Sequence, residues 1–197
     1  MKQHVYIVWS HPRRDSLTAQ MVHSLRQRAE ARGAHVTELD LYRSDFDPVL
    51  RVEDEPEWDN PDKRYSPEVH RLFAELDNQD IIFFVFPVWW YSFPAMLKGY
   101  LERVWNYGLA YGEQNRLTAK TVRWLALAGG SHRSFIKYGW EKNITDHLLG
   151  VSAYLAIRDV DVHFLYNTLG VEEAIEDDVS HYAQLFEQMY AVVDSTV

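Results

Sequence analysis

Residues 81–106 read IIFFVFPVWWYSFPAMLKGYLERVWN, and this stretch decides the fold class. The run Ile81–Phe86 is apolar throughout and rich in β-branched and aromatic side chains, which is typical of a strand buried on both faces. Pro94 opens the next segment, 94–106, whose apolar residues lie around most of a helical circumference. A buried strand that leads into a helix is the repeating unit of a parallel sheet covered by helices.

The same alternation extends over the rest of the chain. Apolar runs predict strands at Val5–Trp9, Thr121–Ala128 and Val160–Leu165, and an alternating run predicts an edge or near-edge strand at Val36–Leu41. Periodicity and capping signals predict helices at 17–29, 66–76, 94–106, 140–155 and 172–193. This order predicts one α/β domain over 1–197, a flavodoxin-like open parallel five-stranded sheet of order 2-1-3-4-5 with helices on both faces. Ligands of such sheets bind outside the carboxyl ends of the strands, beside the first strand.

Composition narrows the possible functions. The chain has 197 residues, a formal net charge of -9 and no cysteine, which excludes disulfides, cysteine-ligated metals and thiol nucleophiles. A pI near 5.4 argues against a nucleic-acid partner. The nine histidines are scattered without an HExxH motif, so no metal site is expected. The N-terminal apolar run is too short for a signal peptide or a transmembrane segment, and we expect a cytoplasmic protein.

The loop after the first predicted strand runs from His11 into a helix. Ser16 and Thr18 offer hydroxyl groups there, and the free N–H groups of a helix start attract a phosphate. An equally good interpretation is that Asp15 or Ser16 merely caps the helix, and the sequence leaves both open.

The loops after the third and fourth predicted strands carry aromatic residues and glycines. Trp89–Tyr91 form a flat apolar wall suited to a planar ring; a core rim is the alternative, but the position beside the first strand favours the ring. Gly129-Gly130 lets a ligand approach the backbone closely, although a simple turn is the commoner role of such a pair.

Taken in order, His11-Pro12 with Ser16, the segment FPVWWYSFPAMLKGYLERVW at 86–105, and Gly129-Gly130 resemble the flavodoxin-like NAD(P)H:quinone oxidoreductases. That family includes bacterial modulators of drug activity and ancillary proteins of glutathione-gated potassium efflux systems. The likeness covers residues 5–165 and is greatest to enterobacterial NAD(P)H oxidoreductases. It implies a bound flavin, with FAD preferred over FMN, and NAD(P)H as co-substrate.

The resemblance also implies site residues. Residues of the loop that begins at His11 would hold the flavin phosphate, and residues of the loop at the start of the 86–105 segment would contact the ring and ribityl chain. Residues around the glycine pair would line the pyrimidine side, where backbone N–H groups can stabilise negative charge. The implied cofactor-binding residues are His11, Ser16, Leu17 and Thr18; Pro87, Val88, Trp89, Trp90 and Tyr91; and Leu127, Ala128, Gly129, Gly130 and Phe135.

The chain departs from the family shortly after the glycine pair. Mammalian members carry a Tyr and a His there, at positions that correspond to Phe135 and Glu141. Phe135 cannot donate a hydrogen bond, and an ionised Glu141 would repel an anionic reduced flavin. Tyr138 or His132 could substitute from the same loop, so the candidate catalytic residues are Tyr138, Glu141 and His132.

These expectations converge on a flavin-dependent NAD(P)H oxidoreductase that transfers two electrons to a quinone-like acceptor by a ping-pong mechanism. The alternative is a regulatory ancillary flavoprotein of a glutathione-gated potassium efflux transporter, in peripheral contact with the membrane protein. A one-electron flavodoxin carrier fits less well.

The connection at 43–65 is long for a compact domain. Family members use this region to cover a partner subunit's site, which implies a homodimer. Its acidic stretch, residues 53–59, is expected to be a solvated loop rather than a carboxylate site.

Overall fold

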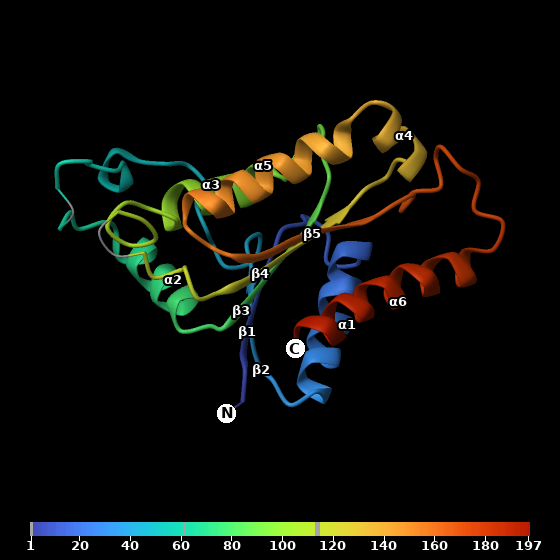
Figure 1. Cartoon of the computed structure of the whole chain (residues 1–197), viewed down its shortest axis with the longest axis horizontal. Helices are drawn as coiled ribbons and strands as arrows, with labels where there is room; N and C mark the ends of the chain where they lie inside the picture. Colours follow the sequence, from blue (N-terminus) through green and yellow to red (C-terminus); the bar gives the residue numbers. More distant parts are fainter. Residues whose placement is uncertain (1, 61, 113–114) are drawn as a thin grey trace.

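The protein folds around one five-stranded parallel sheet of order β2-β1-β3-β4-β5, which confirms the predicted topology. The computed structural model describes residues 2–60, 62–112 and 115–197 (Figure 1). The strands are β1 (His4–Trp9), β2 (His35–Asp40), β3 (Ile81–Pro87), β4 (Thr121–Leu127) and β5 (Asp159–Leu165). Every residue of β3 is buried, as its uninterrupted apolar run predicted.

Helices cover both faces of the sheet (Figure 1). They are α1 (Leu17–Ala31), α2 (Pro67–Asp77), α3 (Ala95–Val104), α4 (His132–Lys137), α5 (Trp140–Tyr154) and α6 (Asp178–Thr196), with a short 3₁₀ helix, η1, at Val52–Asp54. Alternate residues of β1 serve two cores: Ile7 packs with α1 and α6, and Val8 packs with α2, α3 and α5. Within the described residues, no helix is both long and apolar enough to span a membrane.

Three features of the C-terminal third differ from the sequence prediction. The last helix begins at Asp178 with Asp177 as its N-cap, so Glu172 lies in the preceding loop rather than in the helix. Strand β5 is only partly buried, because it forms an edge of the sheet and contacts a neighbouring strand on one side alone. The short α4 was not predicted, since six residues are too few to show helical periodicity.

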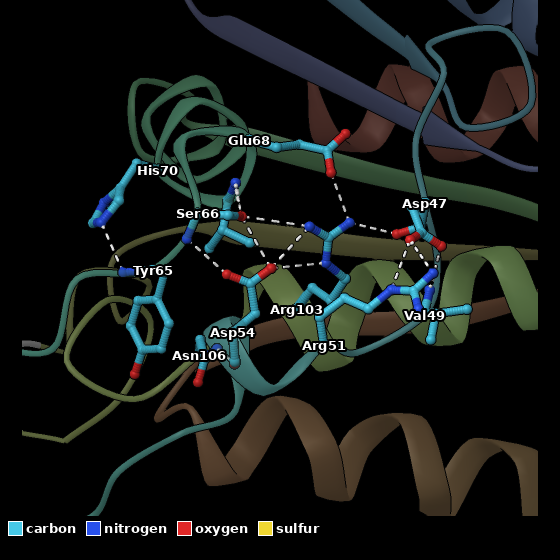
Figure 2. A network of polar contacts seen from close by, with 11 residues as sticks. Asp47, Val49, Arg51, Asp54, Tyr65, Ser66, Glu68, His70, Arg103 and Asn106 are labelled. Atoms are coloured by element: carbon cyan, nitrogen blue, oxygen red, sulfur yellow. Dashed lines mark hydrogen bonds and ion pairs between the residues drawn. The ribbon is translucent and has the colours of Figure 1, made fainter.

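The prediction of a fully solvated acidic stretch was wrong at one residue, Asp54. Its side chain is completely buried, and its Oδ2 accepts hydrogen bonds from Nε and Nη2 of Arg103 at 3.1 and 2.8 Å (Figure 2). Arg103 also pairs with Glu68 at 2.7 Å, and Asn106 donates to the Asp54 carbonyl at 2.6 Å. A buried charge is tolerated only with such partners. The network therefore fastens the long segment to α2 and α3.

Candidate functional site

The candidate site consists of two adjoining cavities at the carboxyl ends of the strands. The first, here the phosphate-loop cavity, has a volume of about 490 Å³ and lies between the β1–α1 loop, the β3 exit and α6. The second, the aromatic cavity, has a volume of about 330 Å³ and lies between the β3 exit and the start of α5. Val88, Gly129 and Leu169 line both cavities, so the two adjoin along these residues. Their position beside β1 is where doubly wound sheets bind ligands.

The β1–α1 loop forms the polar wall of the phosphate-loop cavity. Ser16 caps α1, its Oγ accepting the Ala19 N–H at 3.1 Å, so the capping interpretation holds. That bond occupies one acceptor position of the hydroxyl and leaves its proton available to an anion. Thr18 is almost fully buried and also lines the cavity. Capping and anion binding are therefore compatible at this helix start.

His11 contributes a neutral hydrogen-bonding group to the same wall. Burial lowers the pKa of its imidazole, and its Nδ1 accepts the Arg13 N–H at 3.1 Å. The proton of the neutral ring is then on Nε2, where it can be donated to a ligand. Arg43, which no pattern in the sequence indicates, fixes this loop by donating to the His11 and Pro12 carbonyls at 2.7 and 3.0 Å.

The three tryptophan and tyrosine residues after β3 lie in a tight turn. Trp89 and Ser92 exchange backbone hydrogen bonds of 2.9 and 3.0 Å, which leaves Trp90 and Tyr91 as the two central residues. Both have left-handed backbones, with φ of 51° and 56°, in a turn that normally uses Asn and Gly. Trp90 is 96% exposed. A strained backbone that holds an indole in solvent at a cavity is a feature of binding sites.

Aromatic side chains from α4 and α5 complete the aromatic cavity. The Tyr91 ring stacks on Trp140 with centroids 3.8 Å apart, and Phe135 meets Trp140 edge-on at 5.7 Å. Trp140 was predicted only as a helix start, because nothing in the sequence shows that it meets a residue 49 positions earlier. Together these rings form a rigid apolar wall suited to a planar ligand.

The glycine pair lies beneath the loop between β5 and α6. A Cβ at Gly129 would lie 2.9 Å from Leu169 Cδ1, and one at Gly130 would lie 3.1 Å from Glu172 Oε1, so the close approach of this loop accounts for both glycines. Glu172 Oε2 accepts the N–H and Oγ–H of Ser131, each at 2.9 Å. Hydrogen bonds from Ser134 and Ser131 lower the pKa of Glu172, which is therefore ionised at neutral pH. Leu169 and Glu172 are site residues that sequence reasoning missed.

The candidate catalytic residues lie beside the aromatic cavity, and none of them lines it. Glu141 accepts a hydrogen bond from the Tyr166 hydroxyl, and its Oε2 lies 3.4 Å from His132 Nε2. Burial and the bond to Glu141 raise the pKa of Tyr166. Tyr138 lies apart from this group and packs on Trp140 with centroids 4.7 Å apart. The structure thus brings Glu141 and His132 together and adds Tyr166, which no pattern in the sequence indicates.

The predicted cofactor residues divide between the two cavities. Ala128 lines neither; it is fully buried, and its N–H and carbonyl bond to the backbone of residues 165 and 168. The phosphate-loop cavity is lined by His11, Ser16, Leu17, Thr18, Pro87, Val88, Trp89, Leu127 and Gly129. The aromatic cavity is lined by Val88, Trp90, Tyr91, Gly129, Gly130 and Phe135.

Known proteins with similar sequences and folds agree with this architecture. A family model described as the flavodoxin-like fold matches residues 3–189. The chain is 54% identical over 193 residues to the uncharacterized NAD(P)H oxidoreductase YcaK of Escherichia coli (strain K12), which covers 98% of both chains.

Solved structures show the same fold at lower identity. The NAD(P)H:quinone oxidoreductase from Methanothermobacter marburgensis has a TM-score of 0.84 at 22% identity, covering 98% of this chain and 95% of that chain. An FMN-dependent NADH-azoreductase from Bacillus anthracis str. Ames Ancestor, solved in complex with FMN, has a TM-score of 0.74 at 13% identity, covering 98% of both chains. With a family model that matches nearly the whole sequence and a relative more than half identical along its length, the chain belongs to the flavodoxin-like fold family.

Proposed function

We propose that the protein is a flavin-dependent NAD(P)H oxidoreductase that transfers two electrons to a quinone-like acceptor by a ping-pong mechanism. One observation carries this proposal: a helix start suited to an anion and a set of stacked aromatic rings lie in adjoining cavities at the carboxyl edge of the sheet. A flavin nucleotide has both a phosphate and a planar ring, so these residues fit it. The names of the relatives, an NAD(P)H oxidoreductase and a quinone oxidoreductase among them, support the same activity.

FAD is the flavin we favour. The phosphate-loop cavity is lined by Ser16 and Leu17 and also by two aromatic residues of α6, Tyr182 and Phe186. A mononucleotide ends at its single phosphate, whereas a dinucleotide needs room for a second planar ring beyond it. Arg13 also lines the cavity and can neutralise charge on a pyrophosphate.

In this proposal the flavin supplies the two-electron chemistry, and the net reaction is NAD(P)H + H⁺ + quinone → NAD(P)⁺ + hydroquinone. The chain would bind and orient the reactants: Ser16 and Thr18 would hold the phosphate, and Trp90 and Tyr91 would contact both the flavin ring and the planar substrate beside it and would exclude water. Glu141 and His132, whose Oε2 and Nε2 atoms lie 3.4 Å apart, do not line the aromatic cavity, so they could pass a proton to the reduced quinone only through intervening water.

The absorption spectrum of the purified protein tests the activity. We expect yellow protein that bleaches with NADPH and recovers its colour with menadione, and we expect mass spectrometry of the released cofactor to find FAD. Release of FMN would contradict only the choice of flavin. Colourless protein that binds neither added FMN nor added FAD would contradict the proposed function.

We further propose a homodimer in which the long segment before α2 covers a partner subunit's site. The buried ion pair between Asp54 and Arg103 holds this segment to its own subunit, while Trp58 remains 62% exposed beside Tyr107 and Tyr111. A segment that is held in place and carries an exposed indole is suited to a contact between subunits. Sedimentation equilibrium should give twice the chain mass, and the Trp58→Ser variant should dissociate more readily; a monomer at micromolar concentration contradicts this arrangement.

One observation favours the alternative function, a regulatory flavoprotein of a glutathione-gated potassium efflux transporter. The candidate catalytic residues do not line the aromatic cavity, and an acidic Glu141 lies where the resemblance implies a histidine. Slow turnover with every acceptor, together with co-purification of the chain with a transporter, would favour this role.

A further inference from the structure

The aromatic cavity contains a fixed negative charge. Glu172 lies in its lining together with Trp90, Tyr91, Phe135 and Trp140. Among the described residues that line this cavity, Glu172 alone carries a formal charge at neutral pH. Because hydrogen bonds from the Ser131 N–H and hydroxyl hold one carboxylate oxygen at 2.9 Å, the charge has a defined position beside the glycine pair.

The aromatic rings around this carboxylate also favour a bound cation. The face of an aromatic ring is electron-rich and attracts a cation placed over it, most strongly for Trp. Trp90 presents its ring to solvent, with 96% of the residue exposed, and Tyr91 is 49% exposed. A planar cation in this cavity can therefore contact an aromatic face and lie near a carboxylate together.

The basic residues near the aromatic cavity lie outside its lining, so none of them neutralises the charge of Glu172 within the cavity. Lys137 lies over the ring of Tyr138, with Nζ 4.9 Å from its centroid, and neither residue belongs to the lining. Arg133 and His132 belong to the same short helix, and neither of them belongs to the lining. The chain as a whole carries a net charge of -9, which adds to the attraction of cations over longer distances.

We propose that the aromatic cavity selects planar aromatic electron acceptors that carry a positive charge over neutral and anionic acceptors of similar size. This inference rests on the proposed function and names its substrate class. For a cationic acceptor A⁺ the reaction balances as NAD(P)H + A⁺ → NAD(P)⁺ + AH, in which the hydride forms a new bond to the acceptor and no further proton is taken up. The reduced acceptor is neutral, so it loses its attraction to Glu172 and leaves more readily.

Binding and turnover of three probes test this selectivity: methylene blue as the cation, menadione as the neutral acceptor and 1,2-naphthoquinone-4-sulfonate as the anion. Quenching of tryptophan fluorescence measures each dissociation constant, and NADPH oxidation measures each kcat/KM. We expect Glu172→Gln to reduce the preference for methylene blue over the sulfonate by about three- to tenfold in both measurements. The glutamine oxygen can still accept the Ser131 N–H, so the loop keeps its conformation.

Two further variants and a salt series separate charge from shape. Glu172→Asp should retain most of the preference, and Glu173→Gln, which removes a neighbouring carboxylate that does not line this cavity, should retain all of it. Raising the ionic strength should weaken the preference in the wild-type protein and have little effect in Glu172→Gln.

The outcomes distinguish this inference from the proposed function. Turnover of menadione with equal preferences in the wild-type and Glu172→Gln proteins overturns the selectivity and leaves the proposed function intact. Absence of turnover with all three probes contradicts the proposed function, and the dissociation constants then still decide whether Glu172 makes the cavity selective for cations.

Discussion

Trp90 and Tyr91 show how this chain uses strained backbone at its candidate site. A left-handed conformation costs a residue with a Cβ about 1–2 kcal/mol, and both residues adopt it in the turn after β3. Glycine or asparagine would form the same turn with less strain. The sequence predicts a flat wall at Trp89–Tyr91, whereas in the structure only Tyr91 stacks in the wall, on Trp140, and Trp90 lies exposed in the turn. The sequence could not reveal the strain, because Trp and Tyr are not turn-forming residues.

Replacing Trp90 by two different small residues separates strain from binding. Trp90→Asn and Trp90→Ala both remove the indole, so both should weaken flavin binding to a similar extent. Only asparagine tolerates the left-handed backbone, and Trp90→Asn should therefore be more stable than Trp90→Ala by about 1 kcal/mol. Urea denaturation and flavin titration measure the two effects. Equal stability of the two variants would show that the turn is not strained, and undiminished flavin affinity in both would contradict the placement of the ring.

At the scale of elements, helix α3 is fitted closely to the long segment that precedes α2. A Cβ at Gly99 would lie 2.2 Å from the Pro48 carbonyl oxygen. Because this oxygen belongs to the backbone, no side-chain rotation could relieve the clash. Gly150 in α5 has nothing within 4 Å of the same position. These two helical glycines therefore have different roles, and the sequence alone does not distinguish them.

Alanine at each of these glycines should change stability in opposite directions. Gly99→Ala must displace the segment around Pro48 and should destabilise the fold by about 1–3 kcal/mol. Gly150→Ala adds a good helix former in open space and should stabilise it by about 0.5–1 kcal/mol. The difference in urea midpoint at constant m-value measures both effects. A neutral Gly99→Ala would mean that α3 and the segment are not in close contact in solution.

Elements that depend on local patterns were predictable, and contacts between distant elements were not. The order of strands and helices along the chain followed from apolar runs and helical periodicity, which are properties of neighbouring residues. The sheet order 2-1-3-4-5 followed from the general rules for connecting parallel strands. The burial of Asp54 depends on Arg103, 49 positions away, and the position of Glu172 depends on Ser131, 41 positions away. Each acidic residue resembled its solvated neighbours in the sequence. Glu172 was accordingly placed in the last helix, whose start is fixed instead by Asp177.

At the scale of the whole molecule, buried tyrosines determine how stability responds to alkaline pH. Burial raises the pKa of Tyr65 and of Tyr111 to about 12, and it also raises the pKa values of Tyr6 and Tyr100. Tyr65 belongs to the long segment before α2, and its hydroxyl donates to the Tyr107 carbonyl at 2.7 Å. An ionised phenolate could not donate this bond.

We therefore expect stability to fall above the ordinary pKa of tyrosine, about 10. A tyrosine with a raised pKa in the folded state stabilises the fold fully below pH 10, because both states are then protonated. Between about pH 10 and pH 12 the unfolded chain loses the proton first, so the unfolding free energy declines with each such tyrosine.

Urea midpoints should be flat from pH 8 to 9.5 and should drop beyond pH 10, and the double variant Tyr65→Phe, Tyr111→Phe should show a shallower drop. Tyr138→Phe is the matched control, because that side chain is 55% exposed, against 6% for Tyr65. If the control flattens the decline as much as the double variant does, burial of Tyr65 and Tyr111 is not its cause.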